Sequence, residues 1–246
     1  SAEGKDGKIL SGWKLRNSNK PARVSEKHSE TAFMTNRAME FIEESSDKPW
    51  FLHLSYIKPH WPYIAPAPYH NMFSQNQFNP VQRSESQKKD MNPVYKAFVE
   101  TRVSKTFSKD EVRNTVMSGY MGLIKQIDDN LGRLFEFLDK KGNMKDTMII
   151  FTSDHGDYLG DHWLGDKELF HEQIVRVPMI IYDPRESANK TRGKKEKRFI
   201  EAIDLLPTFL DAVGSKESKH RLEGNSLIPI INGDKITTWK DAVFSE

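Results

Sequence analysis

The stretch Thr147-Met-Ile-Ile-Phe-Thr-Ser-Asp-His-Gly156 decides the fold, because an uncharged, largely apolar run ends abruptly in polar residues. The run 147–152 is typical of a strand that is buried on both faces of a parallel sheet. A second run of this kind, Pro178-Met-Ile-Ile-Tyr182, follows downstream. Helical patterns alternate with these runs, which predicts an α/β fold with a mostly parallel sheet and helices on both faces.

The strongest helical pattern lies just upstream, from Arg113 to Leu138, where apolar side chains make one face. Gly119 and Gly122 within it predict close packing against a neighbour, and Gly142 is placed to end the helix. The other predicted elements are a polar loop over 1–27 with a short strand at 9–10, a helix from Ser29, a buried strand over 50–55, a proline-rich loop over 56–109, a helix over 205–213 and a strand that starts at 242.

Composition limits the classes of protein that need to be considered. A length of 246 residues, with 37% hydrophobic and 29% charged residues, favours one large globular domain over two small ones. The formal charge of +2 argues against a general nucleic-acid binder. No apolar run approaches the roughly 20 residues that a membrane helix needs, so we expect no membrane partner. The absence of cysteine excludes disulfides and thiolate metal sites.

Asp154 and His155 follow the first apolar run directly. Ligands of α/β sheets bind outside the carboxyl ends of strands, where both side chains can reach one cation. Asp supplies a hard oxygen, His supplies a nitrogen, and Gly156 lets the backbone turn away. The structural alternative is a turn in which Asp154 accepts backbone hydrogen bonds and His155 is merely exposed.

Lys167 ends the glycine-punctuated loop 159–167 that continues from this pair. A lysine beside a metal site is a natural partner for an anionic substrate oxygen. The alternative is a solvated surface lysine.

His60 lies in Lys58-Pro-His-Trp-Pro62, directly after the predicted strand 50–55. Two prolines restrict the backbone around it, and Trp61 can pack beneath it. A rigidly held histidine suits proton donation to a leaving oxygen. A histidine without a function in a loop is the alternative.

Together these motifs resemble the sulfatase family of the alkaline phosphatase superfamily, and within it the phosphonate monoester hydrolases and related arylsulfatases. The resemblance runs in order from about residue 28 to the end. The stretches that carry it are 58–63, 67–70, 120–132, 153–156 followed by 159–162 and Lys167, 176–181, 203–208 and 224–229.

The resemblance implies a metal-dependent hydrolase of small-molecule sulfate esters, with phosphonate monoesters or phosphodiesters as the alternative substrates. Asp154 and His155 would be two ligands of one divalent cation. Ca²⁺ is expected first, with Mn²⁺ or Mg²⁺ as alternatives. Lys167 and His60 would bind the sulfuryl or phosphoryl group, and His60 would also assist departure of the alcohol or phenol.

One part of the family pattern is missing. The family's nucleophile is a formylglycine made in a Cys/Ser-x-Pro-x-Arg motif, but the chain has no cysteine and no Ser-x-Pro-x-Arg. Asn19 stands in that place at 19–23, in a polar loop, and we interpret this as coincidence. The family's early acidic pair is also missing, because the only Asp-Asp, at 128–129, lies within a predicted helix.

We therefore expect 1–246 to be a single partial α/β domain that lacks the N-terminal portion with the nucleophile and a C-terminal extension. Such a chain should be inactive alone, bind metal weakly and tend to self-associate. The compartment stays open between cytoplasm and periplasm. Two other hypotheses remain: a zinc hydrolase that uses His53, His60, His155 or His162 with Asp161, and a non-catalytic relative that keeps only the fold.

Overall fold

The computed structural model of the chain describes residues 1–215 and 221–245. They form two compact units, Ser1–Lys141 with Gly156–Val175, and Gly142–His155 with the described part of 176–246. The prediction of a single domain stays a prediction. The helices and strands of the first unit are β1 (Ala2–Glu3), β2 (Ile9–Leu10), α1 (Glu30–Glu44), α2 (Pro93–Val99), α3 (Arg102–Phe107), α4 (Asp110–Lys140) and α5 (Glu172–Val175).

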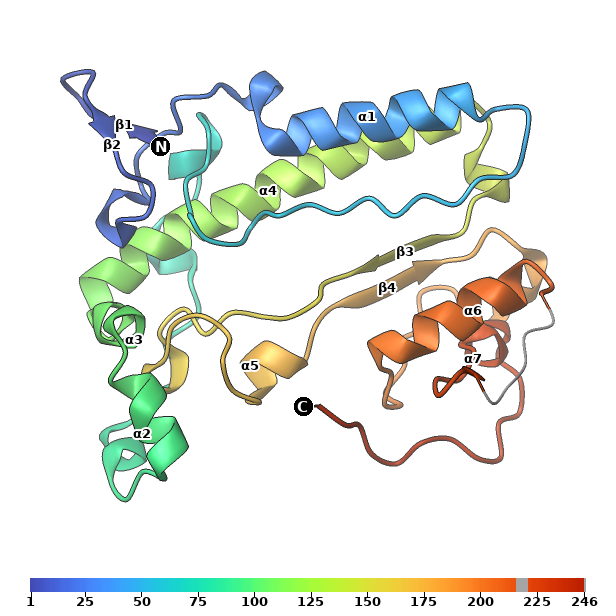
Figure 1. Cartoon of the computed structure of the whole chain (residues 1–246). Helices are drawn as coiled ribbons and strands as arrows, with labels where there is room; N and C mark the ends of the chain where they lie inside the picture. Colours follow the sequence, from blue (N-terminus) through green and yellow to red (C-terminus); the bar gives the residue numbers. More distant parts are fainter. Residues whose placement is uncertain (216–220, 246) are drawn as a thin grey trace. The chain divides into compact units, whose positions relative to one another are not determined.

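Two long helices, α1 and α4, lie side by side in the first unit (Figure 1). α1 begins where the sequence predicts, because Oγ of Ser29 accepts a hydrogen bond from the N–H of Ala32 at 3.2 Å. The same Oγ accepts from Nε2 of Gln126 in α4 at 2.7 Å. The cap of one helix is therefore also a contact with the other.

Glycines in α4 bring a loop against the helix, as predicted. A Cβ added at Gly119 would collide with the carbonyl oxygens of Ser18 and Tyr63, and one added at Gly122 would collide with that of Tyr69. The backbone of the loop thus packs directly on the helix. Asp129, also in α4, accepts a hydrogen bond from the hydroxyl of Tyr69 at 2.9 Å, so the Asp-Asp pair is part of the helix surface as predicted.

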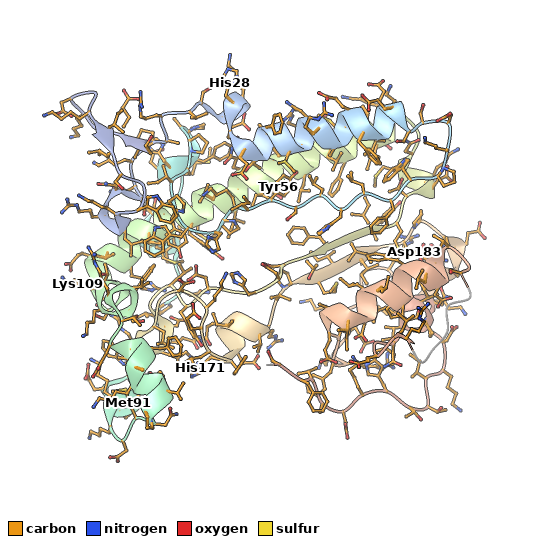
Figure 2. All side chains as sticks on the ribbon, viewed as in Figure 1. His28, Tyr56, Met91, Lys109, His171 and Asp183 are labelled. Atoms are coloured by element: carbon orange, nitrogen blue, oxygen red, sulfur yellow. The ribbon has the colours of Figure 1, made fainter. Side chains whose placement is uncertain are left out.

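The predicted strand over 50–55 is wrong, because the structure assigns no strand there. The segment is extended, and half-buried Trp50, Leu52 and Leu54 alternate with exposed residues as they would on a strand. An alternating pattern predicts an extended backbone, and the assignment of a strand depends on residues outside that pattern. Tyr56 ends this segment with its hydroxyl 2.7 Å from Oγ1 of Thr35 in α1 (Figure 2).

The proline-rich stretch 56–109 has no regular element in its first half beyond short 3₁₀ turns, as predicted. It is nevertheless part of the core. Tyr63 and Tyr69 are buried against Val116 and Leu123 of α4. This packing holds the segment that contains His60 against the longest helix.

The second unit contains β3 (Ile149–Thr152) and β4 (Met179–Tyr182), which form an antiparallel pair with Ile150 opposite Ile181. The predicted mostly parallel sheet is therefore not confirmed by this pair, and the predicted burial of both strands on both faces is wrong for it. Phe151 is 38% and Ile180 63% exposed. An apolar run reports the chance of burial, and it carries no information on the direction of the neighbouring strand.

Short helices complete the second unit, namely α6 (Leu205–Ala212), close to the predicted 205–213, and α7 (Ile228–Asn232). The predicted strand from 242 is wrong, because the described residues there are irregular. Gly142 has a φ of +74° after α4, as its predicted role of helix stop requires. Within 1–215 and 221–245, no helix combines the length and the apolar character that a bilayer crossing would demand.

Candidate active site

Asp154 and His155 follow β3 directly, where the sequence places them. The N–H of His155 donates to Oδ1 of Asp154 at 3.0 Å, and its Nε2 lies 3.6 Å from Asp154 Oδ2. Ser153 Oγ donates to the carbonyl of His155 at 2.8 Å, which fixes the turn. The side chain of Asp154 is 87% exposed and that of His155 25%. A carboxylate that faces solvent is thus adjacent to an imidazole.

The donor atoms of this pair suit part of a divalent-cation site, because Asp offers a hard oxygen and His a borderline nitrogen. Ca²⁺, Mg²⁺ and Mn²⁺ take about six or more donors, so two side chains supply only part of a site. In the part of the chain that the structure describes, no three His, Asp or Glu side chains are close enough together to hold a metal ion. The alternative of a zinc site built from several histidines and Asp161 therefore finds no cluster to support it.

Gly156 begins the return of the chain to the first unit. Its N–H donates to the carbonyl of Ile174 at 2.8 Å, and a Cβ at this position would overlap the carbonyl oxygen of Gln173. Glycine is required here because two backbones touch. Gly156 is thus needed at the predicted turn because a side chain would not fit against the neighbouring backbone, and not because the turn has a positive φ.

The loop from Asp157 to Lys167 is closed by its own backbone. Tyr158 N–H donates to the carbonyl of Asp166 at 3.0 Å, and Gly160 N–H donates to that of Leu164 at 2.9 Å. Leu159, His162, Trp163 and Asp166 all have positive φ. Such a concentration of unfavourable backbone conformations persists only where the surroundings enforce it, and it is typical of functional sites. Lys167 is delivered at the end of this rigid loop.

His60 is held by the segment around it. Its Nδ1 lies 2.9 Å from the carbonyl oxygen of Trp61, and since a carbonyl only accepts, Nδ1 carries the hydrogen. Nζ of Lys58 donates to the carbonyls of His60 and Pro62, at 3.2 and 2.9 Å. Burial lowers the pKa of Lys58. The hydrogen bond from Nδ1 and the contacts of Lys58 fix the orientation of the His60 imidazole.

Tyr63 and Asp157 join the His60 segment to the Lys167 loop. The hydroxyl of Tyr63 donates to Asp157 Oδ2 at 2.5 Å, and the N–H of Leu159 donates to Oδ1 at 3.1 Å. Burial, followed by the charge of Asp157, raises the pKa of Tyr63, which keeps the phenol a donor. Sequence reasoning missed Tyr63, although its place directly after the second proline of the His60 motif marks it.

His162 in the loop stacks on His171, which follows the loop. The rings of His162 and His171 are 4.2 Å apart at 18°, and Nδ1 of His171 lies 2.8 Å from the hydroxyl of Tyr158. Gln87 Nε2 lies 2.8 Å from Nδ1 of His162, and Gln173 Oε1 lies 3.1 Å from its Nε2. Through Tyr158, Gln87 and Gln173 the two histidines tie the loop to the residues around it. The sequence did not reveal this role.

The four predicted site residues therefore fall into two pairs. Asp154 and His155 touch each other in the second unit, whereas His60 and Lys167 both belong to the first unit, on segments joined through Tyr63 and Asp157. The gathering of all four around one oxyanion stays a prediction.

Comparison with known proteins assigns the chain to a family. A family model described as Sulfatase matches residues 6–215. The multifunctional alkaline phosphatase superfamily protein PehA of Trinickia caryophylli is 35% identical over 240 residues, 92% of this chain and 46% of that protein. An arylsulfatase of Clostridium perfringens is 31% identical over 228 residues, 88% of this chain and 44% of that protein. The chain spans less than half the length of these relatives.

Solved structures agree with this assignment. The phosphonate monoester hydrolase SpPMH of Silicibacter pomeroyi superposes with a TM-score of 0.84 and 29% identity, and covers 97% of this chain and 47% of its own. The phosphonate monoester hydrolase of Agrobacterium radiobacter superposes with a TM-score of 0.81 and 29% identity, and the match covers 91% of this chain and 46% of that one. The predicted α/β, alkaline-phosphatase-like fold class is confirmed at this level, although its mostly parallel sheet is not. With the family model matched over residues 6–215, the chain belongs to the sulfatase family.

Proposed function

We propose that the complete protein hydrolyses sulfate esters, with phosphonate monoesters and phosphodiesters as the alternative substrates. The observation that carries the proposal is the Asp154–His155 pair at the end of β3, followed without a break by the rigid loop that ends in Lys167. Membership of the sulfatase family supports an oxyanion-binding role for this arrangement.

In this proposal Asp154 and His155 are two of the ligands of a divalent cation, with Ca²⁺ expected first and Mn²⁺ or Mg²⁺ as alternatives. When bound, such a cation supplies a Lewis acid at the sulfuryl or phosphoryl oxygens. The side chains of this chain bind and orient the ester. The ammonium group of Lys167 donates hydrogen bonds to an anionic oxygen, and Nε2 of His60 gives a proton to the departing oxygen.

The nucleophile is outside this division of roles, because the chain has no cysteine and no Ser-x-Pro-x-Arg. We propose that the 246-residue chain alone does not turn over. A non-catalytic relative would also lack turnover, so the two are separated by the complete open reading frame that encodes the chain. Activity of its product supports the enzyme, and inactivity of a folded, metal-loaded product supports the non-catalytic relative.

The test uses that complete product with paired substrates, 4-nitrophenyl sulfate and 4-nitrophenyl phenylphosphonate. Asp154→Ala and Lys167→Met should each lower kcat/KM by at least a thousandfold. Matched changes of exposed residues, Asp47→Ala and Lys145→Met, should retain the parent rate. Parent-like turnover in Asp154→Ala or Lys167→Met would remove the case for the site, and the ratio of the two rates identifies the preferred ester.

A further inference from the structure

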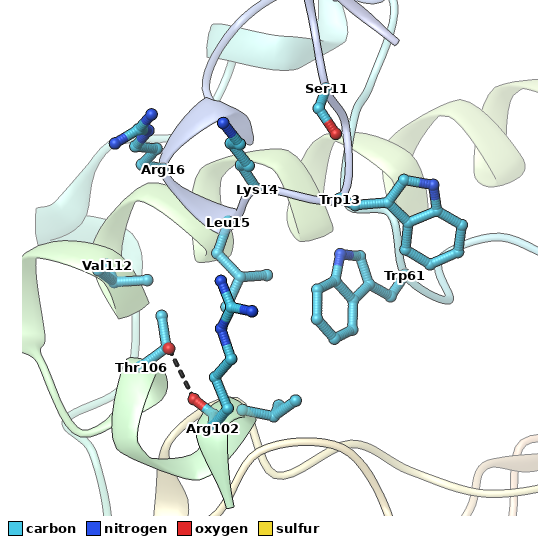
Figure 3. A pocket seen from close by; sticks show the side chains of 10 residues that line it. Ser11, Trp13, Lys14, Leu15, Arg16, Trp61, Arg102, Thr106 and Val112 are labelled. Atoms are coloured by element: carbon cyan, nitrogen blue, oxygen red, sulfur yellow. Dashed lines mark hydrogen bonds between the residues drawn. The ribbon is translucent and has the colours of Figure 1, made fainter.

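A pocket with a volume of about 680 Å³ lies in the first unit, next to the His60 segment (Figure 3). The turn after β2 contributes Trp13, Lys14 and Arg16, the His60 segment contributes Trp61, and α3 contributes Arg102. This volume suits a small organic molecule, because ligand pockets of proteins commonly measure 300–1,000 Å³.

The pocket has one fixed and one exposed aromatic wall. The ring of Trp61 stacks on Tyr63 at 6.2 Å and 3°, and Tyr63 is 1% exposed, so this wall is anchored in the core. Trp13 lies across from it, with ring centroids 5.9 Å apart and a tilt of 55°, and is 66% exposed. Two indoles at an angle offer faces and edges to an aromatic guest, which prefers offset or edge-to-face contacts.

The charge of the pocket has one sign. Lys14, Arg16 and Arg102 line it and no acidic residue does. Among the described residues, none of these three cations lies within 4.0 Å of a carboxylate oxygen of the first unit. In Figure 3 the side chain of Arg102 reaches from α3 towards Leu15, with Trp61 beside it. Arginine in this place can pair with an acid group and stack on a ring.

The indole nitrogen of Trp61 supports a polar guest. Trp61 Nε1 is shielded from solvent and has no hydrogen-bond acceptor among the described residues. By contrast, Nε1 of Trp163 donates to the carbonyl of Ser84 and Nε1 of Trp239 to that of Phe199, each at 2.8 Å. Buried donors are normally satisfied. A guest that displaces the exposed Trp13 ring and brings an acceptor would complete the missing bond.

We propose that this pocket binds an aromatic ring that carries an acid group, with the ring against Trp61 in the place that the exposed Trp13 indole now takes and the acid group on Arg102. Trp61 follows His60 directly, and the carbonyl of Trp61 holds the imidazole of His60. In the proposed function His60 gives a proton to the departing oxygen, so a pocket next to His60 receives the departing part of the ester. The guest is therefore the leaving group, an aryl group with a second negative charge. This last step rests on the proposed function, whereas binding of the aromatic anion does not.

The binding test uses the 246-residue chain labelled with ¹⁵N, whose five tryptophans give five indole N–H signals. Naphthalene-2-sulfonate should shift the Trp61 signal, assigned by its absence in Trp61→Phe, and leave the Trp163 and Trp239 signals in place. Methanesulfonate and 2-naphthol, which each lack one half of the guest, should bind at least tenfold more weakly. Equal binding of either would overturn the proposal, as would an unmoved Trp61 signal.

Arg102→Gln tests the charge, because the residue is exposed at the start of α3 and its loss should not unfold the chain, which circular dichroism checks. The substitution should lower the affinity for naphthalene-2-sulfonate at least tenfold without changing the affinity for 2-naphthol. The matched variant Arg23→Gln, at an exposed arginine outside the pocket, should bind like the parent. Unchanged sulfonate affinity in Arg102→Gln would overturn the assignment of Arg102.

The leaving-group assignment is tested in the complete product by the kcat/KM ratio of 4-carboxyphenyl sulfate to phenyl sulfate. The parent should prefer the carboxylated ester at least tenfold, and Arg102→Gln should bring the ratio close to one. A ratio near one in the parent would overturn the leaving-group assignment and leave the proposed function intact. Absence of turnover with every ester, together with a shifted Trp61 signal, would overturn the proposed function and leave the pocket intact.

Discussion

The hydroxyl of Tyr63 donates to Oδ2 of Asp157 at 2.5 Å, across 94 positions of the chain. Tyr63 is three residues from His60, and Asp157 opens the loop that ends at Lys167. One hydrogen bond therefore fixes the two segments on which both predicted substrate-binding residues of the first unit lie.

Tyr63→Phe tests this bond. The change leaves the Asp157 carboxylate without its phenol donor and should lower the free energy of unfolding by about 1–3 kcal/mol. Urea unfolding, followed by tryptophan fluorescence, measures the loss. Tyr120→Phe is the matched control, because Tyr120 packs edge-on against Tyr63 at 6.0 Å and its hydroxyl has no hydrogen-bond partner among the described residues. Equal free energies of unfolding for the two variants would show that the hydrogen bond between Tyr63 and Asp157 does not stabilise the fold.

Two glycines of α4 give opposite expectations. Gly122→Ala would push a methyl group into the carbonyl oxygen of Tyr69 and should destabilise the first unit by about 1–3 kcal/mol. Gly132→Ala meets nothing within 4 Å and should stabilise the helix by up to about 1 kcal/mol. Midpoints of denaturant unfolding compare the two. If both substitutions stabilised the protein, the close approach of the loop to the helix would be wrong.

The stacked histidines predict a pH dependence of stability. Burial, followed by the charge of His162, lowers the pKa of His171 in the folded state. Between that value and the usual value near 6.5, the unfolded chain binds the proton more tightly, so folding stability is full above about pH 6.5 and falls as the pH drops. One such group changes the free energy of unfolding by at most about 1.4 kcal/mol per pH unit.

His171→Phe keeps an aromatic ring and removes the titration. Its unfolding free energy should therefore fall less steeply than that of the parent between pH 7 and pH 5.5, as measured by urea unfolding at several pH values. Above pH 7.5 the two slopes should coincide. A parent-like slope in the variant over the acidic range would show that another group titrates.

One lysine, Lys240, neutralises the buried carboxylate of Asp204 in the second unit. Asp204 has no exposed side-chain area and accepts from Lys240 Nζ at 2.9 Å, as well as from the N–H groups of Glu201 and Asn225 at 2.8 Å. Lys240→Met strands this charge and should cost about 3–5 kcal/mol. Thermal or urea unfolding measures the cost, with Lys235→Met, at an exposed lysine, as the matched control.

Asp204→Asn in the Lys240→Met background tests the cause. It removes the stranded charge, so it should recover part of the lost stability. A further loss of stability in the double variant would contradict a stranded charge as the cause of the loss in Lys240→Met.

The sequence determined the long helices, the short β2 strand, the Asp154–His155 pair after β3, and the family. Each of these depends on neighbours along the chain. Helical periodicity and the Ser29 cap need only residues three or four positions apart, and family motifs are read in order.

Only the tertiary structure decided which segments meet. It paired β3 with β4 in antiparallel fashion, left 50–55 extended without strand status, joined Tyr63 to Asp157, and stacked His162 on His171. Partners of this kind lie between 9 and 94 positions apart, and the free energy that selects them comes from burial and hydrogen bonding summed over the folded unit. A local sequence pattern contains no information on this total free energy. The sequence therefore identifies the chemical groups of the site, and the fold determines which of them lie next to each other.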